Sequence, residues 1–261
     1  MRLLAPYHQD DLLPTLAEEL PPDWADAIIT ADLAAGADGW QRLAPIYAAV
    51  ANGVASAQVS PTVVSGCCCV SLGTLAGLQR AGVDPAVVWI DAHGDVQTME
   101  TSASGYLGGM PLRVMAGYRP DLVAAEIGLR PIQEDRLVLV DARDLDEPEA
   151  AYLEIAQIRR TSVVELDESA LPDGPLLLHV DLDVIDPPDL PGLRFPVNGG
   201  PSAAQVVECV RRVQATGRVA AFDLAATWDP AAPDPDGARR RLADELLNQD
   251  ASWAGAIVDW Q

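Results

Sequence analysis

The chain has 261 residues, of which 49% are hydrophobic, and this is enough apolar sequence to bury the core of a globular protein. Its formal net charge is −22, and every one of the 17 basic residues is arginine. A field of this sign repels nucleic-acid phosphates and anionic membranes, which argues against partners of both kinds.

No apolar run approaches the roughly 18 residues of a membrane helix, and no targeting segment is evident, so we expect a cytoplasmic protein. Three of the four cysteines are adjacent (Cys67, Cys68 and Cys69), and Cys209 lies in a predicted helix. This spacing is not that of a disulfide framework.

Short β-branched segments predict strands at residues 2–7, 61–66, 86–91, 136–141, 161–166, 176–183 and 218–224. Helical periodicity predicts helices at 70–80 and at 202–216, the second with Ser202 as its N-cap and Gly217 after its end. Strands that are apolar throughout and alternate with helices indicate an α/β fold, a three-layer sandwich with a central, mostly parallel sheet. We expect a single domain over residues 1–261.

Carboxylates cluster where these strands end, which is where open α/β sheets bind ligands. The sequence W-I-D-A-H-G-D places Asp91, His93 and Asp95 on one side of an extended segment, and L-H-V-D-L-D does the same for Asp181 and Asp183. A single Asp after a strand is more often a cap, but two such clusters are better explained by a site. Four converging carboxylates repel one another unless a cation neutralises them.

A divalent metal is therefore predicted at this edge of the sheet. Oxygen ligands with one imidazole favour Mn²⁺, with Mg²⁺, Fe²⁺, Co²⁺ or Ni²⁺ as alternatives.

D-A-H-G-D at 91–95 and D-L-D-V-I-D-P at 181–187 resemble the two central signatures of the ureohydrolase family of arginases, agmatinases and formimidoylglutamases. The resemblance covers about residues 61–230. It implies two Mn²⁺ ions that share a hydroxide, which attacks a guanidinium carbon and releases urea and an amine. Asp91 and Asp181 would bridge the ions, Asp95 would serve the first, and His93 and Asp183 the second. Asp95 or Asp183 would also act in catalysis by orienting the hydroxide.

Three positions depart from the family pattern. The signature G-G-D-H-S appears as S-G-C-C-C at 65–69, so Cys68 stands in place of a metal-binding histidine. A soft thiolate matches Mn²⁺ poorly, and we therefore expect one tightly bound Mn²⁺ rather than two. Gly108 takes the place of the family's proton-shuttle histidine, and Ala226 that of a guanidinium-binding glutamate.

A substrate-reading loop is retained in A-R-D-L-D-E-P-E at 142–149. The resemblance implies that Asp146, with Glu149, receives the α-amino group of a small-molecule substrate. It also makes Gln97, Ser104 and Tyr106 candidate substrate contacts, and a homo-oligomer is possible.

Segments C-C-V-S-L at 68–72 and G-Y-L-G-G-M at 105–110 are similar to those of hydroxyarginine hydrolases within this family. The leading interpretation is a metal-dependent hydrolase of a C–N bond in a guanidino or N-hydroxyguanidino amino acid. One alternative is an enzyme of the same fold acting on another amide, amidine or ureido compound, since Ala226 and Phe195 reshape the guanidinium pocket. Another is a non-catalytic metal-binding paralogue. A nucleophilic cysteine is weaker, because the available base, His93, is better used as a ligand.

Overall fold

The computed structural model describes residues 1–33, 38–234 and 236–248, and a parallel sheet of eight strands runs through its centre. The strand order is β4-β1-β5-β10-β9-β6-β7-β8, and every neighbouring pair is parallel. A short antiparallel hairpin, β2-β3, lies apart from this sheet. The strands are β1 (Arg2–Ala5), β2 (Tyr7–His8), β3 (Asp11–Leu12), β4 (Ala27–Ile28), β5 (Thr62–Ser65), β6 (Ala86–His93), β7 (Leu137–Asp144), β8 (Arg159–Thr161), β9 (Leu176–Asp181) and β10 (Val219–Ala225).

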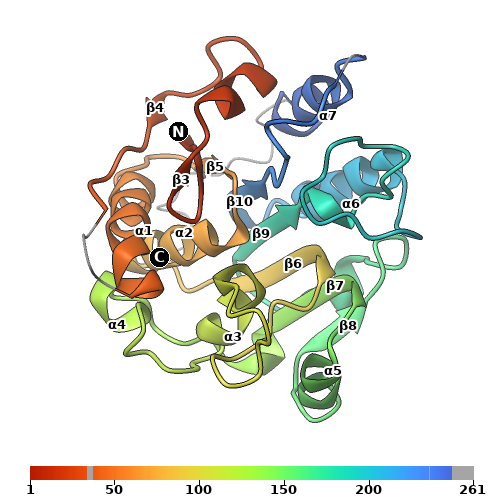
Figure 1. The fold of residues 1–261 in the computed structure, drawn as a ribbon. Helices are drawn as coiled ribbons and strands as arrows, with labels where there is room; N and C mark the ends of the chain where they lie inside the picture. Colours follow the sequence, from red (N-terminus) through yellow and green to blue (C-terminus); the bar gives the residue numbers. More distant parts are fainter. Residues whose placement is uncertain (34–37, 235, 249–261) are drawn as a thin grey trace.

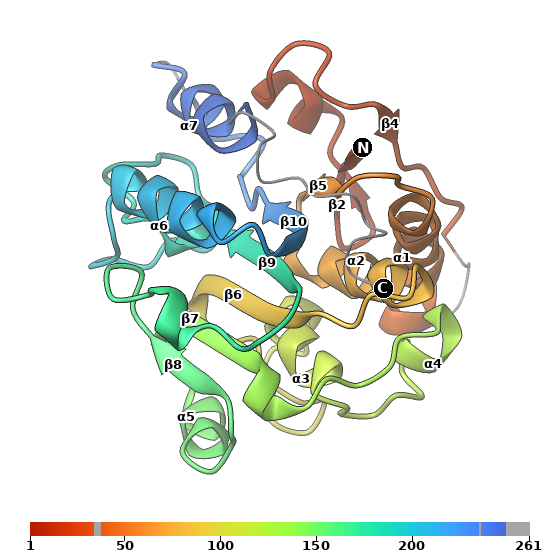
Figure 2. The same cartoon turned by 180° about the vertical axis from the view of Figure 1, so that it is seen from behind.

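Helices cover both faces of the sheet, as Figures 1 and 2 show: α1 to α4 lie on one face, and α6 and α7 on the other. The predicted three-layer α/β fold is thereby confirmed. Within the described residues, none of these helices combines the length and apolarity needed to cross a membrane. The helices are α1 (Gly39–Ala55), α2 (Ser71–Arg80), α3 (Pro111–Met115), α4 (Ala124–Ile127), α5 (Glu147–Leu153), α6 (Ala203–Ala215) and α7 (Ala238–Leu247).

Successive strand residues enter two separate hydrophobic cores, one on each side of the sheet. On β9, Leu177 packs in the core beneath α1 and α2, and Leu178 packs in the core beneath α6 and α7. Val63 and Val64 divide in the same way on β5. Side chains alternate across a strand, so a sheet covered on both faces needs apolar residues at consecutive positions. This is why the strands read as continuous apolar runs.

The two predicted helices are confirmed. Ser202 caps α6: its Oγ accepts a hydrogen bond from the Gln205 amide at 3.2 Å, and Gln205 Oε1 accepts one from the Ser202 amide at 2.8 Å. This reciprocal pair satisfies two amides that the first turn of a helix leaves without partners.

Two predicted strands have other bounds than expected, and three short strands were missed. The strand expected at 161–166 lies earlier, as β8, and Val163 and Leu166 are buried in the turn that follows it. The strand expected at 176–183 ends at Asp181, after which Leu182–Val184 form a 3₁₀ turn. The short strands β2, β3 and β4 were not predicted, because two residues carry no usable periodicity.

Candidate metal centre

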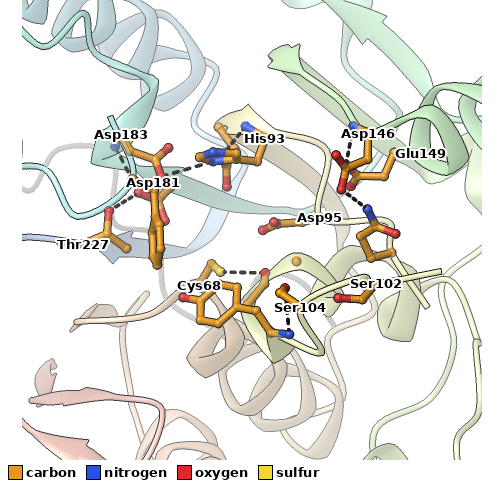
Figure 3. A pocket seen from close by; sticks show the side chains of 16 residues that line it. Cys68, His93, Asp95, Ser102, Ser104, Asp146, Glu149, Asp181, Asp183 and Thr227 are labelled. Carbon is orange, nitrogen blue, oxygen red and sulfur yellow. Dashed lines mark hydrogen bonds and ion pairs between the residues drawn. The ribbon is translucent and has the colours of Figure 1, made fainter. Parts of the chain in front are cut away.

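A pocket of about 410 Å³ opens at the carboxyl ends of β6, β9 and β10 (Figure 3). Asp181, Asp183 and Thr227 lie on one side of it, and Asp146 and Glu149 on the other, with Asp95 between them. The pocket brings together all the residues predicted for the site: Cys68, Asp91, His93, Asp95, Gln97, Ser104, Tyr106, Asp146, Glu149, Asp181 and Asp183.

The end of β6 supplies Asp91 and His93, which are tightly paired. The His93 amide donates to Asp91 Oδ1 at 2.8 Å, and His93 Nδ1 lies 3.3 Å from the same oxygen and 3.2 Å from Asp183 Oδ2. Burial alone would lower the pKa of His93, but its contacts with Asp183 and Asp91 raise that pKa to about 12. In the metal-free protein, the His93 ring therefore carries a proton between two carboxylates.

The end of β9 supplies Asp181 and Asp183, both 2% exposed. Asp181 Oδ1 accepts hydrogen bonds from Thr227 Oγ1 at 2.6 Å and from the Asp183 amide at 3.0 Å. Burial, followed by the charges of Asp183 and Asp91, raises the pKa of Asp181 well above its usual range. Burial and the charge of Asp91 raise the pKa of Asp183 to about 7. Both shifts show that the cluster has an excess of negative charge.

Asp95 reaches the pocket by a different route from the one expected. Strand β6 ends at His93, and Asp95 has a left-handed backbone with φ of 53°, so strand alternation does not orient it. Its carboxylate is buried, and Oδ2 has no hydrogen-bond partner. Burial and the charge of Asp91 raise the pKa of Asp95 well above its usual range. A strained residue with a buried, unpaired oxygen is typical of a functional site.

Among the described residues, three groups of donor atoms have the spacing of a metal site, one of them made of Cys67, Cys68 and Cys69. The other two share Asp91. In the first, the His93 group, ligand atoms of Asp91, His93 and Asp183 lie within 4.8 Å of one another. In the second, the His179 group, the same holds for Asp91, His179 and Asp181. Three buried atoms here have no hydrogen-bond partner: Asp95 Oδ2, Asp183 Oδ1 and His179 Nε2. These donors fit a divalent cation, which satisfies such atoms and neutralises the carboxylates.

Cys68 lines the pocket but belongs to neither of the groups that share Asp91. Its Sγ donates to the carbonyl of Gly108 at 3.2 Å, and its sulfur lies within 4.8 Å of those of Cys67 and Cys69. Contacts with Cys67 and Cys69, together with burial, raise the pKa of the Cys68 thiol. All four cysteines are free and buried, as expected from their spacing. A protonated thiol bonded to a carbonyl is a poor metal ligand.

The opposite wall of the pocket is built on the start of α5. Asp146 is the N-cap of this helix, and its Oδ2 accepts a hydrogen bond from Gln97 Nε2 at 2.7 Å. Gln97 is itself oriented by Thr101, whose hydroxyl donates to Gln97 Oε1 at 2.7 Å. Glu149 accepts from the amides of Asp146 and Val96 at 3.1 and 3.2 Å. Asp146 thus lines the pocket with an exposed side chain, while both Glu149 oxygens are engaged by the backbone.

Arg143 fastens the loop between β9 and α6 to the end of β7. Its guanidinium donates to the carbonyls of Val184 and Val197 at 3.1 and 2.7 Å and pairs with Asp141 at 2.6 Å. The same loop carries Phe195 into the pocket wall. Arg143 therefore fixes the position of an aromatic side chain that borders the metal centre.

A family model confirms the relationship that this geometry indicates: the model of the arginase family matches residues 12–248. The chain belongs to the arginase family. Membership implies a metal cofactor, in agreement with the two donor groups that share Asp91.

Curated relatives and solved structures give the same result. The chain is 38% identical to an arginase of Bacillus subtilis over 57% of this chain and 55% of the relative. It is 36% identical to the N(omega)-hydroxy-L-arginine amidinohydrolase of Streptomyces lavendulae over 69% of this chain and 64% of the relative. The matched segments thus span about half to two thirds of these relatives.

Among solved structures, the arginase of Bacillus subtilis superimposes with a TM-score of 0.77 at 25% identity, covering 95% of this chain and 98% of that one. The Entamoeba histolytica arginase, solved with L-ornithine, superimposes with a TM-score of 0.80 at 20% identity, covering 95% and 98%. The second match, at this low identity, shows a shared fold.

Gly108 has no room for a side chain while Tyr106 keeps its position. A Cβ on Gly108 would overlap the ring of Tyr106. Tyr106 is held from the other side, because its hydroxyl lies 2.9 Å from His8 Nε2 and its ring centroid lies 5.1 Å from that of Phe195. The tyrosine therefore fills the space that a residue at 108 would occupy.

The structure corrects the role of Ala226. It is fully buried in the core beneath α6 and α7 and does not line the pocket. The next residue, Thr227, lines the pocket and bonds to Asp181. Strand β10 ends at Ala225, so a one-residue offset at its end decides which side chain faces the site.

Sequence reasoning missed His179 as a member of the site. A lone histidine in an apolar strand is usually a satisfied core residue. The available indication was alternation, which places residue 179 on the same face of β9 as Asp181.

Proposed function

We propose that this chain is a metal-dependent hydrolase of a C–N bond in a guanidino or N-hydroxyguanidino amino acid. The observation that carries the proposal is the pair of donor groups sharing Asp91 beneath a pocket that also presents Asp146. As part of the same proposal, the protein is a single domain, acts on a small molecule in the cytoplasm, and forms homo-oligomers.

The chain's own residues supply binding and proton transfer. Asp91, His93 and Asp183, which form one donor group, would hold one tightly bound Mn²⁺ together with Asp181 of the neighbouring group. When bound, a divalent ion supplies a water nucleophile of lowered pKa. Asp95 Oδ2 and Asp183 Oδ1 have no other hydrogen-bond partner, so each can orient the attacking water and accept its proton.

The opposite wall binds the amino-acid end of the substrate. Asp146 lines the pocket and offers its carboxylate to an α-ammonium group, and Gln97 holds this carboxylate in place. Glu149 supports this arrangement through its bonds to the backbone and adds negative charge nearby. Ser104 and Tyr106 complete the wall on the side of Gly108.

The pocket favours a weakly basic guanidine as substrate. Thr227, a neutral residue, stands on the β10 side, and Phe195 adds an apolar wall. An N-hydroxylated guanidine is less basic than a free one, needs less charge pairing and protonates its leaving group more easily. Similarity to the hydroxyarginine amidinohydrolase of Streptomyces lavendulae, at 36% identity, supports this choice. Because this wall is neutral, a ureido or amide compound is the second candidate substrate.

A substrate screen tests the proposal. Mn²⁺-loaded protein is incubated with arginine, N-hydroxyarginine, agmatine and citrulline, and release of amine, urea and hydroxyurea is measured. We expect N-hydroxyarginine to be hydrolysed fastest and an Asp181→Asn control to be inactive. Turnover of citrulline alone would support the ureido alternative, and a metal-loaded protein without any turnover would support a non-catalytic paralogue.

The number of tightly bound ions has its own test. The protein purified without added metal should hold one Mn²⁺ by elemental analysis, and Cys68→His should recruit a second. The reason is that a neutral imidazole binds at pH 7 to 8 without the deprotonation that the thiol requires. Two fully occupied Mn²⁺ sites in the unmodified protein purified without added metal would contradict this proposal.

A further inference from the structure

His179 is a buried histidine that the proposed chemistry does not use. It lies in β9, is 0% exposed, and stacks on Trp89 with ring centroids 3.7 Å apart. Strand register places it between Trp89 of β6 and Asp223 of β10. Asp181, two residues further along β9, lies on the same face of the sheet. His179 therefore sits directly beneath the metal centre.

Hydrogen bonds fix the proton of the imidazole on Nδ1. Ser71 Oγ lies 2.7 Å from His179 Nδ1 and 3.0 Å from Asp223 Oδ1. A carboxylate oxygen only accepts, so the single hydroxyl proton of Ser71 goes to Asp223. The Nδ1–H then donates to Ser71 and to Asp223, which lies 3.2 Å away. Thr74 of α2 donates to the second oxygen of Asp223, so this carboxylate is satisfied.

The other nitrogen, Nε2, is left with a lone pair and no partner. It is buried, and no hydrogen bond reaches it from any residue that the structure describes. A ring nitrogen of His179 lies within 4.8 Å of carboxylate oxygens of both Asp91 and Asp181. Ionised carboxylates cannot donate to a lone pair, so ionised Asp91 and Asp181 repel that of His179 unless a cation lies between them.

We propose that His179, Asp91 and Asp181 hold a second, more weakly bound divalent cation, with His179 in place of the ligand that Cys68 fails to provide. The cation is one that accepts imidazole and carboxylate together, such as Mn²⁺, Co²⁺ or Zn²⁺. This inference rests on the metal centre of the proposed function. Cys68 takes no part, because its thiol donates to the carbonyl of Gly108.

Asp223 acts as a positioning residue in this arrangement. Metal-binding histidines usually donate their other N–H to a carboxylate, which fixes the tautomer and the orientation of the ring. Asp223, itself held by Ser71 and Thr74, does this for His179. The network extends from α2 to the sheet and is wholly buried, so the imidazole is set before any ion arrives.

The first test uses the unmodified protein and needs no mutation. The chain has three histidines, of which His8 belongs to neither donor group. Protein labelled with ¹⁵N at histidine is titrated with Mn²⁺ and examined by pulsed EPR for nitrogen couplings. At saturation we expect couplings to two different histidines. The second coupling should appear as the weaker binding step is filled. Coupling to one histidine at saturation would overturn the proposal.

The second test assigns the weaker step by calorimetry with Mn²⁺. His179→Gln should lower the affinity of the second ion about tenfold or more and leave the first unchanged. Asp223→Asn, which allows the tautomer to switch, should also weaken the second step. Cys68→Ser should keep both steps. Loss of the second step in Cys68→Ser, with its retention in His179→Gln, would overturn the assignment.

These binding measurements separate this inference from the proposed function. Two bound ions without turnover of any substrate would contradict the proposed function and leave the role of His179 intact. Hydrolysis by a protein whose metal couples to a single histidine would support the proposed function and contradict the role of His179. Circular dichroism checks that each variant is folded, and the labelled, unmodified protein decides the matter if His179→Gln does not fold.

Discussion

Replacing Asp146 tests the substrate-binding wall most directly. The carboxylate is anchored at one oxygen by Gln97 Nε2, at 2.7 Å, and Gln97 is in turn oriented by Thr101. The side chain is exposed and lines the pocket. Asp146→Ala removes the proposed partner of the substrate's ammonium group and leaves the metal ligands untouched.

The expected magnitude follows from the bond that is lost. A hydrogen bond to a charged group contributes about 1.5 to 3 kcal/mol, which corresponds to a rise in KM of roughly 10- to 150-fold. The turnover number should change little, because the interaction is present in both the bound substrate and the transition state. Steady-state kinetics with an α-amino acid substrate and with its des-amino analogue give the measurement, and the analogue should not distinguish the variant from the parent.

A matched control is available one residue away. Glu147 is exposed, begins α5 and does not line the pocket, so Glu147→Ala removes the same charge from the same helix without touching the site. Its KM should equal that of the parent. An unchanged KM in Asp146→Ala would refute the assignment. An equal rise in KM in both variants would also refute it, because it would show that only the negative charge of the helix end matters and not a direct contact.

Three further predictions concern the metal centre and its support. Asp91→Asn and Asp181→Asn should each abolish metal binding, and full metal content in either variant by elemental analysis would contradict their central role. Because the pKa of His93 is raised to about 12, its ring is protonated at neutral pH and an ion must displace that proton. Mn²⁺ affinity should therefore fall about tenfold or more per unit as the pH drops from 8 to 6, and calorimetry showing a pH-independent affinity would oppose this. Arg143→Ala should lower the free energy of unfolding by roughly 2 to 4 kcal/mol, because it leaves Asp141 and two carbonyls without their partner. An unchanged midpoint of urea-induced unfolding would show that contacts other than those of Arg143 hold the loop.

The elements that periodicity predicted well are those whose burial is uniform. Helix α6 was predicted together with its cap, since Ser202 and the apolar face at Val206, Val210 and Val213 favour the same structure. Strand β8 was misplaced, because Val163 and Leu166 are buried by a turn, and burial alone does not distinguish a turn from a strand. Composition identifies apolar segments, whereas only packing decides their backbone conformation.

In the site, the sequence predicted which residues take part better than it predicted how their side chains are oriented. Most Asp and His residues of the pocket were predicted from two short motifs, and its other predicted members from the family resemblance. Asp95, however, reaches the pocket through a left-handed backbone instead of an extended one. The sequence could not predict whether Ala226 or Thr227 faces the pocket, because the alternation of side chains stops where β10 ends. His179 escaped notice because its significance depends on Asp223 and Ser71, which are distant in sequence and meet it only after folding.

The packing of Tyr106 against Gly108 limits how this protein can change over evolutionary time. A side chain introduced at position 108 meets the tyrosine ring, and that ring is tied to His8 and packed on Phe195. A histidine at 108 therefore requires Tyr106 to leave its contacts with His8 and Phe195 or to be replaced by a smaller residue. Selection for an acid–base group at position 108 therefore acts on positions 106 and 108 together.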